Sequence, residues 1–311
     1  MTQAPKHFIN LPEIPDETLK AILKAAHALK KQKYTPPQLL DGLSLAMIFD
    51  KRSTRTRLSF EIAMKQLGGH TLVMTKDDMQ LGGSESIEDT AKVLSRFVDA
   101  VMIRISNHSM VEELASFSSI PIINALTDES HPCQIMADIM TIEEKLGSIA
   151  GKKLAWFGDY NNVAKTFVQA APKFDFELKL AVPEPLLPDN CDLLNQGNIS
   201  IGSDPIHAAQ NADVIITDTW VSMGQEGKTI DMFLPYRVNS ELMSNAKSEA
   251  IFMHCMPIHR GEEVTDEVLN SPACVIYDEA ENRLHAQKAI LAYCMQNSGV
   301  QVQTTKESLF G

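Results

Sequence analysis

The feature that most constrains the fold is a series of short, uninterrupted apolar runs separated by longer amphipathic patterns. The runs have strand length and consist mainly of aliphatic residues, as in LAMIF and DVIIT. Strands that do not alternate polar and apolar residues are buried on both faces, which is typical of parallel sheets covered by helices. We therefore expect an α/β fold. Nine runs are predicted as strands: 43–49, 70–74, 100–104, 121–126, 152–158, 178–182, 212–218, 250–255 and 273–278.

Helical patterns fill the intervals between these runs, and several of them end in glycine. The clearest helices are predicted at 56–69, 86–98, 133–147 and 161–174. About four strands fall in each half of the chain, on either side of the stretch LGSIAGKK. We predict two doubly wound domains at residues 1–147 and 148–284, each a mainly parallel sheet flanked by helices, with the active site in the cleft between them. Residues 285–311 are predicted as a helix that returns to the first domain, followed by a tail.

Composition limits the partners of the protein. The chain has 311 residues, 44% of them hydrophobic, which is enough for two cores, and its formal net charge is −12. An acidic balance argues against a broad nucleic-acid or anionic-membrane surface, because both require an extended basic face. The start MTQAPKHFINLPEIP lacks the basic segment and apolar run of a signal peptide, so a cytoplasmic location is expected. The five cysteines are odd in number and contain no C-x-x-C, which predicts reduced thiols.

A local basic stretch contrasts with this acidic background. FDKRSTRTRLSFE, residues 49–61, contains four cationic and four hydroxyl-bearing side chains and joins a predicted strand to a predicted helix. Backbone N–H groups at a helix start bind phosphate, and Ser53, Thr54, Arg55 and Thr56 add hydroxyls and a guanidinium. A helix cap needs one such residue rather than four, so we predict a site for a small phosphorylated anion. Arg57 can equally form a solvated pair with Glu61 four residues later.

The run Ser53-Thr54-Arg55-Thr56-Arg57 resembles the carbamoyl-phosphate loop of the aspartate/ornithine carbamoyltransferase family. Four further stretches resemble that family in the same order: HPCQ at 131–134, DTWVSMGQE at 218–226, HCMP at 254–257 and ENR at 281–283. The similarity covers essentially the whole chain, and the second and third of these stretches resemble the ornithine branch. It implies direct transfer of a carbamoyl group from carbamoyl phosphate to the δ-amine of L-ornithine, giving citrulline and phosphate, without a cofactor or a metal.

The resemblance also implies roles for individual residues around carbamoyl phosphate. Thr56, Arg104 and His131 are implied to face the carbonyl oxygen, where donors stabilise a tetrahedral intermediate. Arg55 would follow the leaving phosphate, and the amide oxygen of Gln134 would accept from the carbamoyl NH2. Taken alone, Arg104 could be a surface charge and His131 a structural histidine. The implied binding set is Ser53, Thr54, Arg55, Thr56, Gln80, Arg104, His131, Gln134, Cys255, Met256 and Arg283, and the implied catalytic set is Arg55, Thr56, Arg104, His131, Asp218 and Cys255.

The amine substrate is implied to contact the second domain. Asn162 would bind the α-carboxylate of ornithine, and Asp218 would meet its α-ammonium and help orient the reacting amine. Ser222 assists, and Met223 contributes backbone and packing. The alternative of a turn-capping asparagine fits Asn161 better than Asn162.

Cys255 is implied to position and desolvate the attacking amine through Asp218 without becoming a covalent nucleophile. Met256 stands where the family usually has leucine, and its carbonyl can still bind the carbamoyl NH2. Arg283 would complete this end of the site. His254, Cys255 and His259 could suggest a metal, but no second ligand cluster has matching spacing and the reaction needs none.

Other functions fit the sequence less well. A nicotinamide dehydrogenase would use a similar sheet, but WFGDYNN lacks G-x-G-x-x-G, and Glu184 is a weak substitute for the ribose-binding acid. A non-catalytic pathway partner is disfavoured by the intact set of site residues. An aspartate enzyme would need cations for a second carboxylate, whereas N-acetylornithine and putrescine remain alternative amines. The polar stretch DDMQLGG at 77–83 is implied to reach a neighbouring subunit's site through Gln80, in a homotrimer.

Overall fold

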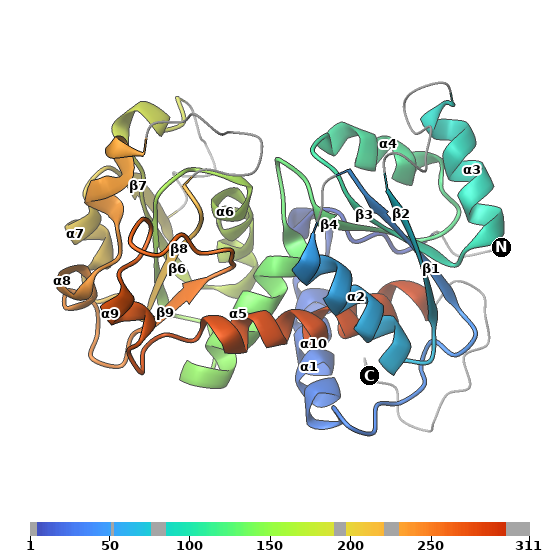
Figure 1. The fold of residues 1–311 in the computed structure, drawn as a ribbon, viewed down its shortest axis with the longest axis horizontal. Coiled ribbons are helices and arrows are strands. Elements are labelled where there is room, and N and C mark those ends of the chain that lie inside the picture. The colour runs from blue at the N-terminus through green and yellow to red at the C-terminus, as the bar shows by residue number, and fades with distance from the viewer. Residues whose placement is uncertain (1–4, 51–52, 76–84, 190–196, 221–229, 297–311) are drawn as a thin grey trace. The chain divides into compact units, whose positions relative to one another are not determined.

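The computed structural model describes residues 5–50, 53–75, 85–189, 197–220 and 230–296 (Figure 1). Contacts divide the chain into two units: Met1–Met140 with Asn282–Gly311, and Thr141–Glu281. The division falls inside α5 (Pro132–Leu146) and inside α10 (Ile276–Met295). The domain borders predicted after residues 147 and 284 stay predictions.

The first unit contains a four-stranded parallel sheet in the order β2-β1-β3-β4. Its strands are β1 (Ser44–Phe49), β2 (His70–Thr75), β3 (Ala100–Arg104) and β4 (Ile122–Leu126). β1 and β3 end level with one another, because Phe49 lies opposite Arg104. This register brings the chain that follows β1 beside the end of β3.

The helices of this unit are α1 (Asp16–Lys31), α2 (Thr54–Gln66), α3 (Ile87–Phe97), α4 (His108–Phe117) and the later part of α10. A short 3-10 helix, η1 (Leu11–Glu13), precedes α1. Figure 1 shows α3 and α4 together on one side of the strands. Their buried residues, among them Ala91 and Leu114, pack in one core with Ile48 of β1 and Ile103 of β3. Within this unit α10 bonds to α1 and α2: Lys30 Nζ donates to Asn282 Oδ1 at 2.7 Å, and Lys288 Nζ donates to Gln66 Oε1 at 3.0 Å.

The second unit contains a five-stranded parallel sheet in the order β7-β6-β5-β8-β9. Its strands are β5 (Lys153–Phe157), β6 (Glu177–Ala181), β7 (Ile199–Gly202), β8 (Val214–Thr217) and β9 (Ile251–His254). α6 (Asn162–Phe174) packs on one face, where the rings of Trp156 and Phe167 lie 6.2 Å apart.

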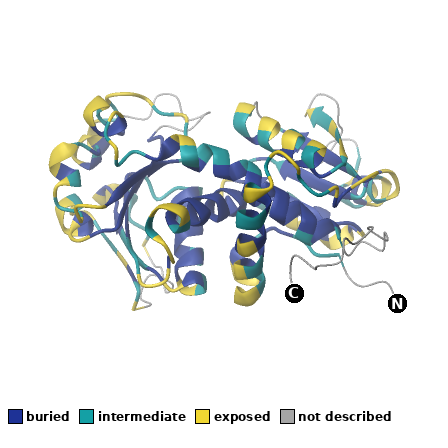
Figure 2. Ribbon diagram, turned by 90° about the horizontal axis from the view of Figure 1, so that it is seen from below, coloured by how far each residue is buried: buried dark blue, intermediate teal, exposed yellow. Residues whose placement is uncertain are grey.

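The opposite face of this sheet packs against short helices: α7 (Pro205–Ala209), α8 (Ser240–Met243), α9 (Asp266–Leu269) and the 3-10 helix η5 (Asp231–Tyr236), while the 3-10 helix η3 (Glu184–Leu186) follows β6. Figure 2 shows the central strands of this sheet in the buried colour and exposure concentrated on outer helical surfaces and loops. In the described ranges, every helix is too short or too polar to cross a membrane.

The predicted fold class is confirmed, because each unit is a parallel sheet flanked by helices. The strand predicted at 273–278 is wrong. Cys274 forms an isolated bridge with Phe252, and α10 starts at Ile276. Asp278 and Glu279 lie in its first helical turn, where the helix dipole favours acids, whereas the short apolar run by itself could not distinguish a strand from a buried helix start. β7 was not predicted because it has four residues and is only partly buried.

Candidate active site

The register of β1 and β3 places the basic stretch beside Arg104. The N–H of Asp50 donates to the carbonyl oxygen of Arg104 at 3.1 Å, and its carboxylate accepts from the N–H of Ser106 at 2.8 Å. α2 then begins at Thr54, with Ser53 as N-cap residue, but the Ser53 side chain does not cap the helix. The first N–H groups of α2 are therefore not satisfied by Ser53, which is the arrangement that anion sites at helix starts use.

Two arginines meet at the hydroxyl of Thr56. Arg104 Nη1 and Arg283 Nη2 each donate to Thr56 Oγ1 at 2.9 Å. Thr56 is fully buried and Arg283 is 4% exposed, so the bond between them forms out of water, while the bond from Arg104 is partly buried. Because a hydroxyl carries no charge, these contacts orient the two guanidinium groups without neutralising them. Two guanidinium groups therefore meet in the first turn of α2.

His131 and Gln134 lie at the start of α5, next to these arginines. The carbonyl oxygen of His131 accepts from the N–H of Gln134 at 3.1 Å. Burial, together with the charges of Arg283 and Arg104, holds the pKa of His131 well below its usual value. The imidazole is therefore neutral at physiological pH and can donate an N–H without adding a cation.

The amide of Gln134 is held at both ends. Its Nε2 donates to Asp138 Oδ1 at 2.7 Å, and its Oε1 accepts from Arg283 Nη1. The same oxygen was expected to accept from a carbamoyl NH2. In this structure it orients Arg283, so a bound carbamoyl group would have to share it or replace that contact.

In the second unit, Asp218 and Cys255 follow adjacent parallel strands. Thr217 of β8 lies opposite His254 of β9, and the next residues of both strands meet: Cys255 Sγ donates to Asp218 Oδ1 at 3.0 Å. Thr219 Oγ1 donates to the same oxygen at 3.1 Å. Asp218 is 8% exposed, and Cys255 is half-buried.

The turn after β9 is braced from inside the unit. The N–H of His254 donates to Glu279 Oε2 at 2.8 Å, and His254 Nδ1 accepts from the N–H of Met256 at 2.9 Å. Met256 has a φ of +60°, a conformation that L side chains rarely adopt. His254 therefore holds a strained turn in place, and this ring nitrogen is already used.

His259 has a structural partner as well. Among described residues, His259, Glu262 and Glu263 have ligand-type atoms within 4.8 Å of one another. The buried carboxylate of Glu263 accepts from His259 Nδ1 and from the His259 N–H, both at 2.8 Å. Burial raises the pKa of Glu263. These two bonds use both oxygens of Glu263, so His259 and Glu263 form a hydrogen-bonded pair of an exposed imidazole and a buried carboxylate.

Asn161 and Asn162 occupy the start of α6. Asn161 is the N-cap residue, as the sequence indicated, and its Oδ1 accepts from the N–H groups of Val163 and Ala164. Asn162 is the first helical residue and is half-buried. Three predicted site residues, Gln80, Ser222 and Met223, lie outside the described residues.

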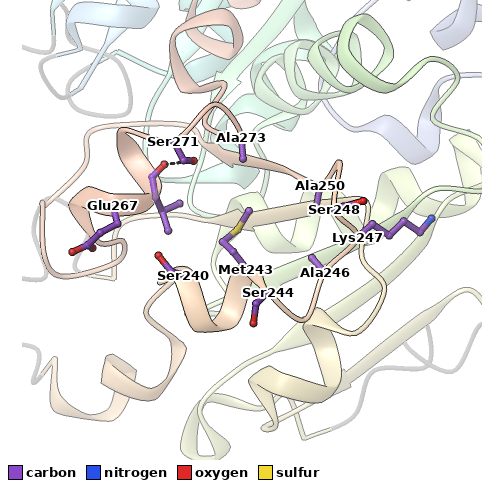
Figure 3. A pocket seen from close by; sticks show the side chains of 11 residues that line it. Ser240, Met243, Ser244, Ala246, Lys247, Ser248, Ala250, Glu267, Ser271 and Ala273 are labelled. Carbon is purple, nitrogen blue, oxygen red and sulfur yellow. Dashed lines mark hydrogen bonds between the residues drawn. The ribbon is translucent and has the colours of Figure 1, made fainter.

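A surface hollow of about 370 Å³ lies elsewhere in the second unit (Figure 3). It lies near Ala250, at the amino end of β9, whereas the clusters above follow carboxyl ends of strands. Figure 3 shows Lys247 extended away from Ser240 and Ser271, and its Nζ is paired with Asp213 at 2.8 Å. The hollow is therefore separate from the candidate chemistry.

The family model for the aspartate/ornithine carbamoyltransferase carbamoyl-P binding domain matches residues 6–144, and the Asp/Orn binding domain model matches residues 150–294. The chain belongs to the aspartate/ornithine carbamoyltransferase family. Brucella ovis ornithine carbamoyltransferase is 53% identical over 305 residues, covering 95% of this chain and 97% of that protein.

Solved structures of family members have the same fold. Ornithine carbamoyltransferase from Pyrococcus furiosus is 45% identical, with a TM-score of 0.90 over 97% of this chain and 100% of that one. The anabolic ornithine carbamoyltransferase from Campylobacter jejuni is 38% identical, with a TM-score of 0.86 over 93% of this chain and 98% of that one. The resemblance stated from the sequence is thereby confirmed at the level of family and fold.

Several contacts in this carbamoyltransferase could not be seen in the sequence. Thr219 supports Asp218 and lies in the DTWVSMGQE stretch, where the sequence assigned it no role, whereas Glu279 supports His254 and lies outside every quoted motif. The sequence predicted that Asn161 caps a helix, but it did not indicate the additional bond from Asn161 to Asp218. The Asn161–Asp218 bond joins the ends of the paired strands β5 and β8, and the His254–Glu279 bond joins the end of β9 to the first turn of α10.

Proposed function

We propose that this carbamoyltransferase transfers the carbamoyl group of carbamoyl phosphate to the δ-amine of L-ornithine, giving L-citrulline and phosphate. The convergence of Arg104 and Arg283 on Thr56 beside the start of α2 is the observation that carries the proposal. Two oriented guanidinium groups and a helix start suit a ligand with a dianionic phosphate and a carbonyl that gains negative charge. Family membership and the names of the relatives support the same reaction.

In the proposed mechanism, the first unit binds the carbamoyl donor. Ser53, Thr54 and Arg55, with Gln80 of a neighbouring subunit, bind the phosphate through hydroxyl, guanidinium and amide donors. Thr56, Arg104 and the neutral His131 donate to the carbonyl oxygen, so negative charge developing there is stabilised as the amine attacks. The tetrahedral intermediate then collapses: the C–O bond to phosphate breaks, the departing phosphate takes the extra proton of the attacking nitrogen, and the arginines hold the remaining phosphate charge. The carbonyl oxygen of Met256 and the amide of Gln134 select the carbamoyl NH2.

The second unit is proposed to bind ornithine. Asp218 meets the α-ammonium, Asn162 the α-carboxylate, and Ser222 and Met223 complete the amine side. Cys255 donates to Asp218 and presents a weakly polar surface to the reacting δ-amine, which favours loss of its proton before attack. The proposal requires both sets of residues to act on one pair of substrates.

The test is an assay of the purified protein with carbamoyl phosphate and four amines: L-ornithine, L-aspartate, N-acetyl-L-ornithine and putrescine. We expect kcat/KM to be highest for ornithine, because Asp218 matches the free α-ammonium that N-acetylornithine and putrescine lack. Acetyl phosphate serves as the control donor and should be used poorly. If kcat/KM is higher for one of the other amines, that amine is the substrate and the proposal for ornithine is wrong.

We also propose a homotrimer in which Gln80 reaches the site of a neighbouring copy. The first unit exposes apolar side chains on α2, on the edge strand β2 and on α3, namely Leu58, Ile62, Leu72, Val93 and Phe97. Exposed apolar groups on several elements of one unit support burial against another copy. Light scattering coupled to size-exclusion chromatography tests the assembly, and a mass of one chain would exclude it.

Arginine biosynthesis in the cytoplasm is the proposed setting. The described cysteines, Cys133, Cys255, Cys274 and Cys294, are free thiols, which suits a reducing compartment. The similar Campylobacter jejuni protein is an anabolic ornithine carbamoyltransferase, which supports a biosynthetic direction. Growth of an arginine auxotroph that lacks ornithine carbamoylation, rescued by this chain and not by its Arg104→Ala variant, is the expected result.

A further inference from the structure

Asn161 uses both ends of its amide. Its Oδ1 accepts from the N–H groups of Val163 and Ala164 at 3.0 and 3.1 Å and so caps α6. Its Nδ2 donates to Asp218 Oδ2 at 2.8 Å. Capping requires the oxygen alone, and Ser, Thr or Asp would supply one equally well. Asparagine adds a donor at the same position, and that donor is directed to a carboxylate.

The Asp218 carboxylate depends on this donor for its orientation. Its Oδ1 accepts from the thiol of Cys255 and from the hydroxyl of Thr219, while its Oδ2 accepts from Asn161. A buried carboxylate is stabilised by hydrogen bonds to both oxygens, and an amide N–H is a stronger donor than a thiol. The Asn161 bond thus fixes which oxygen faces Cys255.

The two ends of this bond belong to well-anchored segments. Asn161 lies in the loop after β5, Asp218 follows β8, and the neighbouring strands are tied by Thr217 Oγ1, which donates to the carbonyl oxygen of Phe157 at 2.7 Å. Gly158, at φ +121°, lets the loop approach Trp220, because a Cβ there would come within 3.2 Å of the indole. The loop therefore cannot shift freely when the Asn161 bond is removed.

We propose that Asn161 is a positioning residue for the amine substrate. One amide orients the carboxylate of Asp218 and caps the helix that begins with Asn162, so it fixes the spacing between the groups proposed for the ammonium and the carboxylate of ornithine. Asn161 itself acts through these neighbours. Because that spacing matters only if ornithine is carbamoylated, the role rests on the proposed function.

Two substitutions separate positioning from capping, since both keep a capping oxygen. In Asn161→Ser the hydroxyl is too short to reach Asp218, and we expect kcat/KM for ornithine to fall about 10- to 100-fold at every pH, as for lost orientation. In Asn161→Asp a second carboxylate faces Asp218, and the pair binds a shared proton as the pH falls. The activity of Asn161→Asp relative to wild type should therefore rise toward acidic pH, while that of Asn161→Ser stays constant.

Asn239→Asp is the matched control. Asn239 caps α8 by accepting from the N–H of Leu242 at 2.8 Å, so the same chemical change is made at another helix start in the same unit. It should leave kcat/KM and its pH profile unchanged. The affinity for carbamoyl phosphate, measured calorimetrically, should be unchanged in both Asn161 variants.

A second readout does not depend on ornithine turnover. Iodoacetamide labelling of Cys255, quantified by mass spectrometry with Cys274 as internal reference, should slow in Asn161→Asp at neutral pH, because the added carboxylate disfavours the thiolate. If wild type forms no citrulline but this labelling changes as expected, the proposed function fails and the link from Asn161 to Asp218 stands. Wild-type kcat/KM and pH profile in Asn161→Ser and Asn161→Asp, with only the melting temperature altered, would overturn the positioning role.

Discussion

Replacing Thr56 with valine tests how the protein prepares its anion site. The change keeps the shape of a fully buried side chain and removes the one oxygen that accepts from both Arg104 and Arg283 at 2.9 Å. A hydrogen bond to a charged donor contributes about 1.5–3 kcal/mol. Arg283 also donates to Gln134 Oε1 and keeps that contact, so the two losses are not fully additive. We expect a combined loss of about 2–3 kcal/mol, which corresponds to roughly 30- to 150-fold in kcat/KM for carbamoyl phosphate.

The assay measures initial rates of citrulline formation at varied carbamoyl phosphate, together with calorimetric binding and melting temperature. Thr90→Val is the matched control, because Thr90 is a buried helical threonine of the same unit whose hydroxyl donates to Glu85 at 2.9 Å. It should alter stability without altering kcat/KM. If Thr56→Val binds carbamoyl phosphate and turns it over within twofold of wild type, preorganisation of the arginines by Thr56 is refuted.

Three further predictions concern the thiol, a buried lysine and the assembly. Cys255→Ala should lower turnover about 10- to 100-fold without abolishing it, as expected for lost positioning, and a carbamoylated Cys255 trapped by mass spectrometry would contradict direct amine attack. Burial lowers the pKa of Lys288 from 10.5 to about 8 in the folded state. Below pH 8 the folded state carries the full cost of a buried charge, and the free energy of unfolding rises as the pH increases from 8 toward 10.5. Lys288→Met removes this titration together with the bonds from Nζ to Gln66 Oε1 and to the carbonyl oxygen of Leu29. Its melting temperature relative to wild type should therefore fall as the pH rises from about 8 to about 10; a constant difference would exclude the titration. Mixing Gln80→Ala with Arg55→Ala subunits should restore activity, and a mixture as inactive as its parents would exclude shared sites.

Most of the fold could be predicted from the sequence because each strand and helix has its own pattern of apolar and polar residues. Continuous apolar runs located eight of the strands, and a phosphate-binding role could be proposed for Ser53, Thr54, Arg55 and Thr56 because they are consecutive. The misassigned run at 273–278 shows the limit of such patterns. Its residues bridge to Phe252 and then start a helix, and only the position of β9 decides where the extended segment ends.

What the sequence by itself determined is the alternation of strands and helices, the family and the residue types at each strand end. Tertiary structure decided which of those residues share a hydrogen bond. Arg283 and Thr56 are 227 positions apart, and Asn161 and Asp218 are 57 apart. Hydrophobic periodicity sets the burial of each element by itself, but the contact between two side chains depends on the pairing and register of different strands. For that reason the second bond of Asn161, the lowered pKa of His131 and the shared hydroxyl of Thr56 exist only in the folded chain.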